Sequence, residues 1–259
     1  MKRGAFMFAL ERQKKIMELL LREGAVSVSR LSNELGVTEE TVRRDLEKLE
    51  KQNSLKRTHG GAVPVDENTY EASLEKRKST NVEAKQKMAK IAAKQVNEGD
   101  TIFLDASTTT FFMARELKTM RNITVITNSL RVIVELDGCE GIKVISVGGV
   151  LSHNQSFVGT LAENSIADNY VASKVFFSSK GITAEGGILE SNEQECGIKK
   201  RMLKNSRHKY YMCDKSKMGS VGFVKLAPIE EINYLISDEI PTDDLKAKFD
   251  EFEIEIITD

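Results

Sequence analysis

Three short segments with apolar residues at helical spacing open the chain, and each has its own start or stop signals. Apolar residues recur through residues 10–22, and Gly24 ends that run. Ser27 can cap a second short helix that Gly36 ends, and Thr38 can cap a third helix with two glutamates in its first turn. Two short helices separated by a glycine-containing turn predict a helix-turn-helix.

The third segment has one apolar face and one polar face. At about 100° per residue, Val42, Leu46 and Leu49 form one stripe. Arg44 points almost opposite that stripe, and Arg43 lies on its shoulder. The second helix of a helix-turn-helix enters the major groove of DNA, where arginine suits phosphates and guanine edges. The segment's predicted DNA contacts are Thr38, Thr41, Arg43, Arg44 and Lys48.

A simpler interpretation treats this polar face as merely solvated. The pairs Glu39–Arg43 and Glu40–Arg44 stand four residues apart, a spacing at which opposite charges stabilise a helix by a few tenths of a kcal/mol. Taken alone, the segment favours this interpretation. Its position as the second helix of the motif favours DNA contact instead.

The stretch "LKRTHGGAV" at residues 55–63 predicts a small hairpin directly after the third helix. Lys56, Arg57 and His59 lie at its edge, where basic residues can hold a phosphate backbone without reading sequence. The alternative is an ordinary hairpin that joins two domains. A helix-turn-helix followed by a basic hairpin makes DNA binding the better interpretation.

The run "TVRRDLEKLEKQNSLKRTHGGAV" resembles the N-terminal signature of DeoR-type transcriptional regulators. The resemblance implies a winged helix-turn-helix that binds operator DNA. Asn53 stands where the family usually has glycine, and asparagine also tolerates the left-handed conformation of such a helix end. Because operators are usually two-fold repeats, we expect a homo-oligomer of even number.

The rest of the chain alternates short apolar runs with helical stretches. Residues 64–80 are polar and predict a linker between a DNA-binding domain at 1–63 and a second domain at 81–259. Strands are predicted at 101–105, 123–127, 143–147, 174–178 and 209–213, and helices at 110–117, 129–136, 160–167 and 193–204. This alternation predicts an α/β fold with an open, mainly parallel sheet and helices on both faces.

Small polar loops follow several of these strands, at the edge where such sheets bind ligands. Asp105 leads into "ASTTT", whose hydroxyl and amide groups at a helix start can form an anion cradle or serve simply as a cap. Asn128 ends the second strand. Lys217, beside a glycine-containing turn, can neutralise a phosphate, although a loop lysine is more often merely solvated. The convergence of these loops favours a site.

The second domain resembles the effector domain of the same family through "FLDASTTT", "VITNS", "VGGVL", "SFVG", "EQECGIKKRM" and "CDKSKMG". That domain is similar in fold to ribose phosphate isomerases and typically senses phosphorylated sugars or related metabolites. The resemblance implicates Asp105, Ser107, Thr108, Thr109, Gly148, Gly149, Glu195, Lys199, Asp214 and Lys217 in effector binding.

An active sugar-phosphate isomerase with a DNA-binding head is the rival hypothesis. Isomerisation needs a base, for which Asp105, Asp214 or Glu195 could serve, and a group such as Lys217 to stabilise the enediolate. The sequence "SSKG" at 178–181 offers no carboxylate at the fourth strand's end. We therefore expect a regulator with no catalytic residues. An interaction module without a small ligand would leave the polar loops unexplained.

Charge and composition support this division. The chain's 259 residues carry a net charge of −1, but residues 1–65 have 13 Lys and Arg against 9 Asp and Glu. The remaining residues then have 25 Lys and Arg against 30 Asp and Glu, so a basic N-terminal domain precedes an acidic second domain. The scattered cysteines and histidines suggest no metal or cofactor, and no apolar run is long enough for a membrane span. We expect a soluble, cytoplasmic protein.

Overall fold

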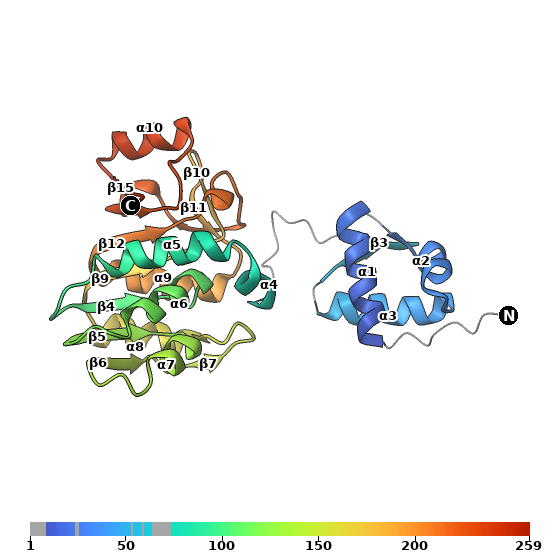
Figure 1. Cartoon of the computed structure of the whole chain (residues 1–259), viewed down its shortest axis with the longest axis horizontal. Helices are drawn as coiled ribbons and strands as arrows, with labels where there is room; N and C mark the ends of the chain where they lie inside the picture. The colour runs from blue at the N-terminus through green and yellow to red at the C-terminus, as the bar shows by residue number, and fades with distance from the viewer. Residues whose placement is uncertain (1–8, 24–25, 53, 59, 64–73) are drawn as a thin grey trace. The chain divides into compact units, whose positions relative to one another are not determined.

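The structure is a computed structural model that describes residues 9–23, 26–52, 54–58, 60–63 and 74–259. The chain divides into an N-terminal unit, residues 1–70, and a C-terminal unit, residues 71–259 (Figure 1). The division falls within the predicted linker, of which residues 64–73 lie outside the described residues. The remainder of that linker is largely the short helix α4 (Leu74–Ser79).

The N-terminal unit contains the three predicted helices and a small antiparallel sheet. The helices are α1 (Ala9–Glu23), α2 (Val28–Leu35) and α3 (Glu39–Lys51). Ser27 caps α2 by accepting from the Arg30 amide, and Thr38 caps α3 by accepting from the Thr41 amide, both at 3.3 Å. Gly36 ends α2 with φ +64°. The predicted caps and the glycine stop of α2 are thus confirmed.

The sheet has strand order β1-β3-β2, formed by β1 (Val26–Ser27), β2 (Lys56–Thr58) and β3 (Gly61–Val63). The β2–β3 hairpin confirms the prediction, whereas β1 was not predicted, because two residues show no alternation. Gly61 is required by β1: a Cβ at that position would lie 1.9 Å from the Val26 carbonyl oxygen. The glycine therefore permits close approach of two strands.

Helix α3 is locked to α1 by a buried charged group. Asp45 is 3% exposed, pairs with the Arg12 guanidinium and accepts from the Gln13 amide at 3.1 Å. On the adjacent face of α3, Val42, Leu46 and Leu49 are buried in the core of the unit, as their spacing predicted. Packing and charge together fix which face of α3 remains exposed.

The C-terminal unit is built on a seven-stranded sheet in which all paired neighbours are parallel. Its order is β15-β14-β12-β9-β4-β5-β6. The strands are β4 (Thr101–Leu104), β5 (Ile123–Thr127), β6 (Ile142–Ser146), β9 (Ala172–Phe177), β12 (Ser206–Met212), β14 (Tyr234–Ile236) and β15 (Glu255–Ile257). The five predicted strands are present with slightly shifted ends.

Helices cover both faces of this sheet, as predicted (Figure 1). Alternation along β4 is the cause: Ile102 and Leu104 face one core, and Phe103 faces the other. The first core includes α5 (Val82–Ala93), α6 (Thr108–Leu117) and α7 (Leu130–Leu136). The second includes α8 (Thr160–Asn169), α9 (Glu193–Lys204) and α10 (Asp243–Glu251).

Shorter elements complete the unit. A second antiparallel sheet has the order β10-β11-β13, from β10 (Gly181–Thr183), β11 (Gly187–Glu190) and β13 (Val224–Ala227). A hairpin joins β7 (Val150–Leu151) to β8 (Phe157–Val158), and 3₁₀ turns span Lys215–Lys217 and Ile229–Glu231. Among the described residues, no helix has the length and apolar character needed to cross a bilayer.

The order of the strands creates a switch point between β4 and β9. From β4 the chain continues outward through β5 and β6, whereas β9 and β12 lie on its other side. In open parallel sheets, a crevice forms at such a reversal, outside the carboxyl ends of the strands. The loops after β4, β9 and β12 all meet at this edge.

Candidate functional site

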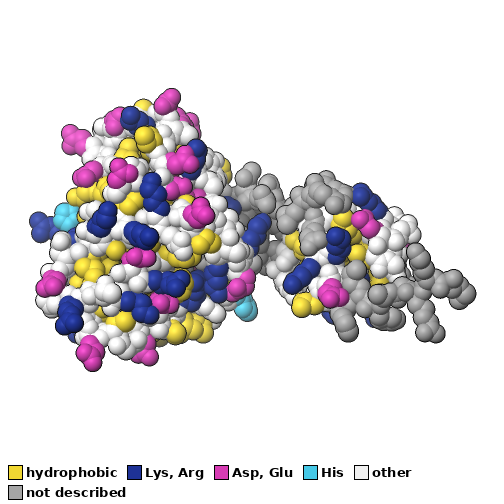
Figure 2. Space-filling view, viewed as in Figure 1, with side chains coloured by type: hydrophobic (Ala, Val, Ile, Leu, Met, Phe, Trp, Pro, Cys, Tyr) yellow, Lys and Arg dark blue, Asp and Glu magenta, His cyan; other side chains and the backbone are white. Residues whose placement is uncertain are grey.

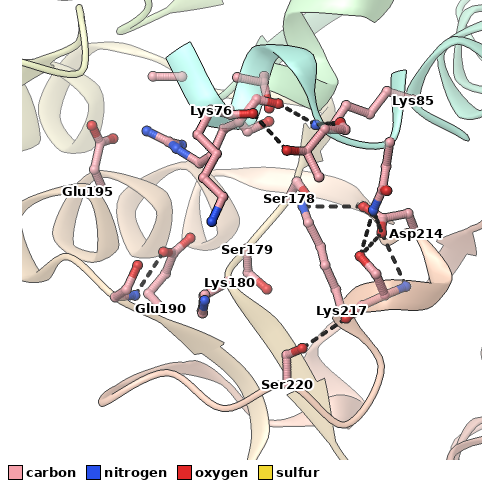
Figure 3. Close-up of a pocket in the computed structure, with 18 of the residues that line it drawn as sticks. Lys76, Lys85, Ser178, Ser179, Lys180, Glu190, Glu195, Asp214, Lys217 and Ser220 are labelled. Carbon is pink, nitrogen blue, oxygen red and sulfur yellow. Dashed lines mark hydrogen bonds and ion pairs between the residues drawn. The ribbon is translucent and has the colours of Figure 1, made fainter. Parts of the chain in front are cut away.

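A cavity of about 220 Å³ lies at the switch point (Figure 3). It receives residues from the loops after β4, β9 and β12, from β11 and α9, and from α4 and the start of α5. The lining residues are Lys76, Arg77, Thr80, Asn81, Lys85, Ala106, Ser107, Thr108, Ser178, Ser179, Lys180, Glu190, Ser191, Glu195, Lys199, Asp214, Ser216, Lys217 and Ser220.

Asp105 organises the loop after β4 from beneath the cavity. Its carboxylate is fully buried and accepts from the Ser107 amide at 3.0 Å, the Ser178 amide at 3.1 Å and the Thr110 hydroxyl at 2.7 Å. Ser107 in turn caps α6 by accepting from the Thr110 amide at 3.1 Å. The two predicted roles of this loop are compatible, because Ser107 both caps the helix and lines the cavity.

Lys199 supplies the counter-charge for a group of buried carboxylates. Its ammonium lies 3.2 Å from Asp105, pairs with Glu190 and donates to the Ser178 carbonyl at 2.7 Å. Burial alone would lower the pKa of Lys199, but Glu190, Asp105 and Glu195 raise it above its usual value. Burial likewise opposes ionisation of Asp105, yet Lys199 and hydrogen bonds keep the pKa of that carboxyl below its usual value. Both groups are therefore charged.

The loop after β12 contributes a more accessible cation. The Lys217 ammonium donates to the Ser178 hydroxyl at 2.6 Å and lies 4.0 Å from Asp214, with its side chain 20% exposed. Asp214 itself is buried and accepts from Asn81 at 3.0 Å. Figure 3 shows the Lys217 side chain running along the cavity toward Ser178, where its charge can meet a ligand.

Lys85 is a second cation with an unusual environment. It is 4% exposed and donates to the carbonyls of Arg77 and Thr80, each at 2.6 Å. Burial, together with the charges of Lys217 and Arg77, lowers the pKa of Lys85 to about 8. An anion in the cavity would oppose that shift and favour the charged form.

Positive charge predominates in the cavity. Lys76, Arg77, Lys85, Lys180, Lys199 and Lys217 face three carboxylates, those of Glu190, Glu195 and Asp214. Figure 3 shows the Lys76 side chain extending into the cavity, which Lys180 also lines. On the visible surface of the same unit, basic and acidic side chains are interspersed (Figure 2). Residues 66–259 carry 25 Lys and Arg against 30 Asp and Glu, so the excess of cations is a local property of the cavity and suits an anionic ligand.

The structure gathers six of the predicted effector residues at the cavity, namely Ser107, Thr108, Glu195, Lys199, Asp214 and Lys217. Asp105, in the loop after β4, and Thr109, in the first turn of α6, are both buried. Asn128, Gly148 and Gly149 do not line the cavity. Asn128 donates to the Phe157 carbonyl at 3.2 Å, and a Cβ at Gly149 would lie 2.7 Å from the Val158 oxygen, so both support the packing of β8.

The main residues that sequence reasoning missed lie on α4 and α5. Lys76, Arg77 and Thr80 fall within the predicted linker, where nothing marked them as part of a site. Lys85 did carry a signal. It stands three residues before Met88 and four before Ala89, on the buried face of α5, where a lysine is unusual.

The exposed face of α3 carries the arginines. The Arg44 side chain is 74% exposed and pairs with Glu40 at 3.3 Å, and Arg43 pairs with Glu39 at 2.7 Å. These are the i,i+4 pairs that the sequence predicted. Such exposed pairs are weak, so the arginines can exchange their glutamate partners for phosphates or base edges at little cost.

The β2–β3 hairpin carries two further predicted DNA contacts. Lys56 is exposed. Arg57 is also exposed, and it is bound to Glu50 of α3 through its side chain at 2.6 Å and its amide at 2.9 Å. This pair fixes the hairpin against α3. His59 and Asn53 lie outside the described residues.

A helix-turn-helix with an adjacent hairpin, and a parallel α/β unit with a cation-rich cavity, together define a ligand-responsive DNA-binding protein. The family model of the DeoR-like helix-turn-helix domain matches residues 12–68, and that of the DeoR C-terminal sensor domain matches residues 80–239. The chain belongs to the DeoR family of transcriptional regulators.

Two sequence relatives of similar length support this assignment. The chain is 44% identical over 233 residues to YulB, an uncharacterized helix-turn-helix transcriptional regulator of Bacillus subtilis, covering 90% of each chain. It is 33% identical over 235 residues to the transcriptional repressor GlcR of the same organism, covering 91% of this chain and 90% of the relative. The solved ribose 5-phosphate isomerase A of Methanocaldococcus jannaschii overlaps 54% of this chain and 55% of its own, with 18% identity and a TM-score of 0.41.

Proposed function

We propose that this protein is a transcriptional repressor that binds operator DNA through α3 and the β2–β3 hairpin. A phosphorylated sugar or related metabolite, bound in the cavity of the C-terminal unit, lowers the affinity for the operator. The observation that carries this proposal is the excess of cations in the cavity, six against three carboxylates. The relative GlcR is named as a transcriptional repressor, which supports repression as the regulatory effect of this protein.

The chemistry of the lining favours a ligand that is both anionic and rich in hydroxyl groups. The ammonium groups of Lys217 and Lys85 suit a phosphate, and Thr108 at the start of α6 supplies an amide donor. The Ser191 hydroxyl, which also lines the cavity, can form a hydrogen bond with a sugar hydroxyl. The cavity is small, about 220 Å³, which suits a small metabolite.

The candidate bases of the isomerase hypothesis are occupied by structural contacts. Asp105 is fully buried with three hydrogen-bond donors and Lys199 around it. Glu195 accepts from the Ser156 hydroxyl, and Asp214 accepts from Asn81. A general base must reach the proton that it abstracts, and these carboxylates instead hold the loops together. We therefore propose a sensor that does not turn over its ligand.

Calorimetric titration with a panel of sugar phosphates tests the ligand, with the unphosphorylated sugars as controls. We expect one or a few phosphorylated sugars to bind and the matching neutral sugars to fail. The same panel, assayed for aldose–ketose turnover, should give no product. Failure of every phosphorylated sugar to bind would overturn the sensor proposal, and turnover would restore the isomerase hypothesis.

A genomic footprint of the protein tests the regulatory part of the proposal. We expect it to protect two-fold repeated sites near genes of sugar metabolism, and the repeats would be bound by a homo-oligomer of even number. Sedimentation of the protein on one such site would give the number of subunits. Protection without repeats, or a monomer on the site, would contradict the proposed assembly.

A further inference from the structure

One wall of the cavity comes from the segment that leads into the C-terminal unit. Helix α4 (Leu74–Ser79), the following turn and the start of α5 contribute Lys76, Arg77, Thr80, Asn81 and Lys85. The residues matched by the helix-turn-helix family model end at 68, and α4 begins at Leu74. The cavity wall is thus close in sequence to the DNA-binding unit.

Lys85 holds the carboxyl end of α4. A helix as short as α4 is not stable by itself, and its last carbonyls have no donors within the helix. The Lys85 ammonium donates to the Arg77 and Thr80 carbonyls at 2.6 Å. An ammonium carries three donors, and within the described part of the chain two of them are used here. The third can meet a ligand.

Asn81 binds the same turn to the loop after β12. It has φ 50° and ψ 43°, a left-handed conformation that asparagine tolerates better than most residues other than glycine. Its side chain donates to Asp214 at 3.0 Å and to the Ser216 hydroxyl at 2.7 Å. These contacts join the turn to the loop that carries Lys217, so a ligand held by Lys217 also lies against the turn.

The other anchor of α4 lies outside the cavity. The Arg77 guanidinium donates to the Asn154 side-chain oxygen at 3.0 Å, in the turn between β7 and β8. Helix α4 is therefore held by Lys85 and Asn81 on the ligand side and by Asn154 on the other. An anion beside Lys85 would strengthen the first set of contacts, because it stabilises the buried ammonium that makes them.

We propose that α4 and the following turn, residues 74–81, form a strap that an anionic ligand orders through Lys85, and that this ordering is the first step of communication toward the DNA-binding unit. The inference rests on the proposed sensor function. A ligand can change operator affinity only if it distinguishes two states of the protein. Here the two states are a loosely held and a firmly held α4.

Hydrogen exchange of the full chain, with inorganic phosphate and glucose 6-phosphate as probes, tests the strap. Binding should slow exchange at residues 107–110 and 214–220, which report the cavity, and at residues 74–81, which report the strap, by roughly fivefold or more. Lys85→Met should bind the probe more weakly, so it is compared at a probe concentration that saturates the variant. There the two cavity segments should still respond, while residues 74–81 should not. Lys87→Met, which removes a contact to the Asp238 carbonyl on an exposed part of α5, should behave as wild type.

The outcomes separate the strap from the sensor. Protection of both cavity segments in wild type with unchanged or faster exchange at residues 74–81 overturns the strap and leaves the sensor function intact. Absence of protection in all three segments with both probes and with every sugar phosphate of the calorimetric panel overturns both. Should Lys85→Met fail to fold, Asn154→Ala replaces it. Asn154 lies outside the cavity, so Asn154→Ala should keep the ligand-induced protection of the cavity segments within about twofold of wild type. It should speed hydrogen exchange of α4 in the ligand-free protein. Unchanged exchange of α4 would contradict the anchoring of this helix by Asn154.

Discussion

The Lys217 ammonium lies 2.6 Å from the Ser178 hydroxyl, which joins the loop after β12 to the end of β9. Strands β12 and β9 are neighbours on one side of the switch point between β4 and β9. The backbone of Ser178 also contacts the buried charged residues. Its amide donates to Asp105, and its carbonyl accepts from Lys199. A ligand that draws Lys217 away from Ser178 therefore changes contacts among three loops.

The affinity for a phosphorylated ligand should fall as pH rises through about 8, because burial lowers the pKa of Lys85 to about 8 and the neutral amine attracts no anion. Between pH 7 and 9 the protonated fraction, and with it the affinity, should fall roughly tenfold. Calorimetric titration across this range measures the effect, since the phosphate's own second ionisation lies lower, near pH 6. An affinity that stays constant in wild type would contradict a ligand beside Lys85.

The same shift has a consequence for stability. A lowered pKa means that the folded chain holds this proton less tightly than the unfolded chain does, so stability should rise with pH between about 8 and the usual lysine value. Lys85→Met should lose both this rise and the pH dependence of ligand affinity. Urea denaturation at several pH values in this window measures the change in stability, and the calorimetric titration measures the change in ligand affinity.

Lys199→Met should destabilise the C-terminal unit by roughly 3–5 kcal/mol, because Asp105 and Glu190 would keep their charges without a partner. The loss should shrink in acid, since the lowered pKa of Asp105 gives a contribution that disappears as pH falls through its folded value. Urea denaturation followed by circular dichroism measures it. Lys209→Met, which breaks a more exposed pair with Glu231, should cost about 1 kcal/mol or less. Equal losses in the two variants would contradict a buried charge network.

Arg44→Ala should leave the N-terminal unit folded and weaken operator binding by about 1–3 kcal/mol per lost base contact. The side chain is 74% exposed and packs on nothing in the core. Lys51→Ala is a suitable control, because Lys51 makes the same kind of i,i+4 pair at the other end of α3. Gel-shift titration should show a much smaller effect for the control. Unchanged affinity in Arg44→Ala would reject α3 as the recognition helix.

Lys56→Ala and Arg57→Ala should each weaken binding to any DNA sequence and reduce the salt slope of binding by about 1, as expected for lost phosphate contacts. Arg57→Ala also removes the link to Glu50, so its effect should include a looser hairpin. Titrations at several salt concentrations, on operator and on unrelated DNA, separate these terms. A change in base preference at one operator position would instead make the hairpin a reader of sequence.

The sequence predicted those parts of the fold that depend on interactions between residues close together in the chain. The caps at Ser27 and Thr38 and the stripe at Val42, Leu46 and Leu49 are visible in the order of residues. In the C-terminal unit, the sequence did not predict strands β7, β8, β10, β11, β13, β14 and β15, since two to four residues are too few to show a period. Their pairing is decided by tertiary contacts.

The candidate site was predicted in part for the same reason. Loops directly after long strands, such as those of Ser107 and Lys217, could be placed at one sheet edge from topology alone. The α4 wall could not, because its arrival at that edge depends on Asn81, whose partner Asp214 is 133 residues away in the sequence. Gly148 and Gly149 matched a family motif but do not line the cavity, and Gly149 packs against β8 instead.

The most direct test of the account is an operator titration with and without the sugar phosphate found by the binding panel, on wild type, Lys217→Met and Lys215→Met. Lys215 lies two residues from Lys217, pairs with Glu239 on the surface and does not line the cavity. The account predicts that the ligand weakens operator binding roughly 5- to 150-fold in wild type and in Lys215→Met. Lys217→Met should bind the operator as wild type does and show no response at the same ligand concentration. A full response in Lys217→Met, or none in wild type, would contradict it.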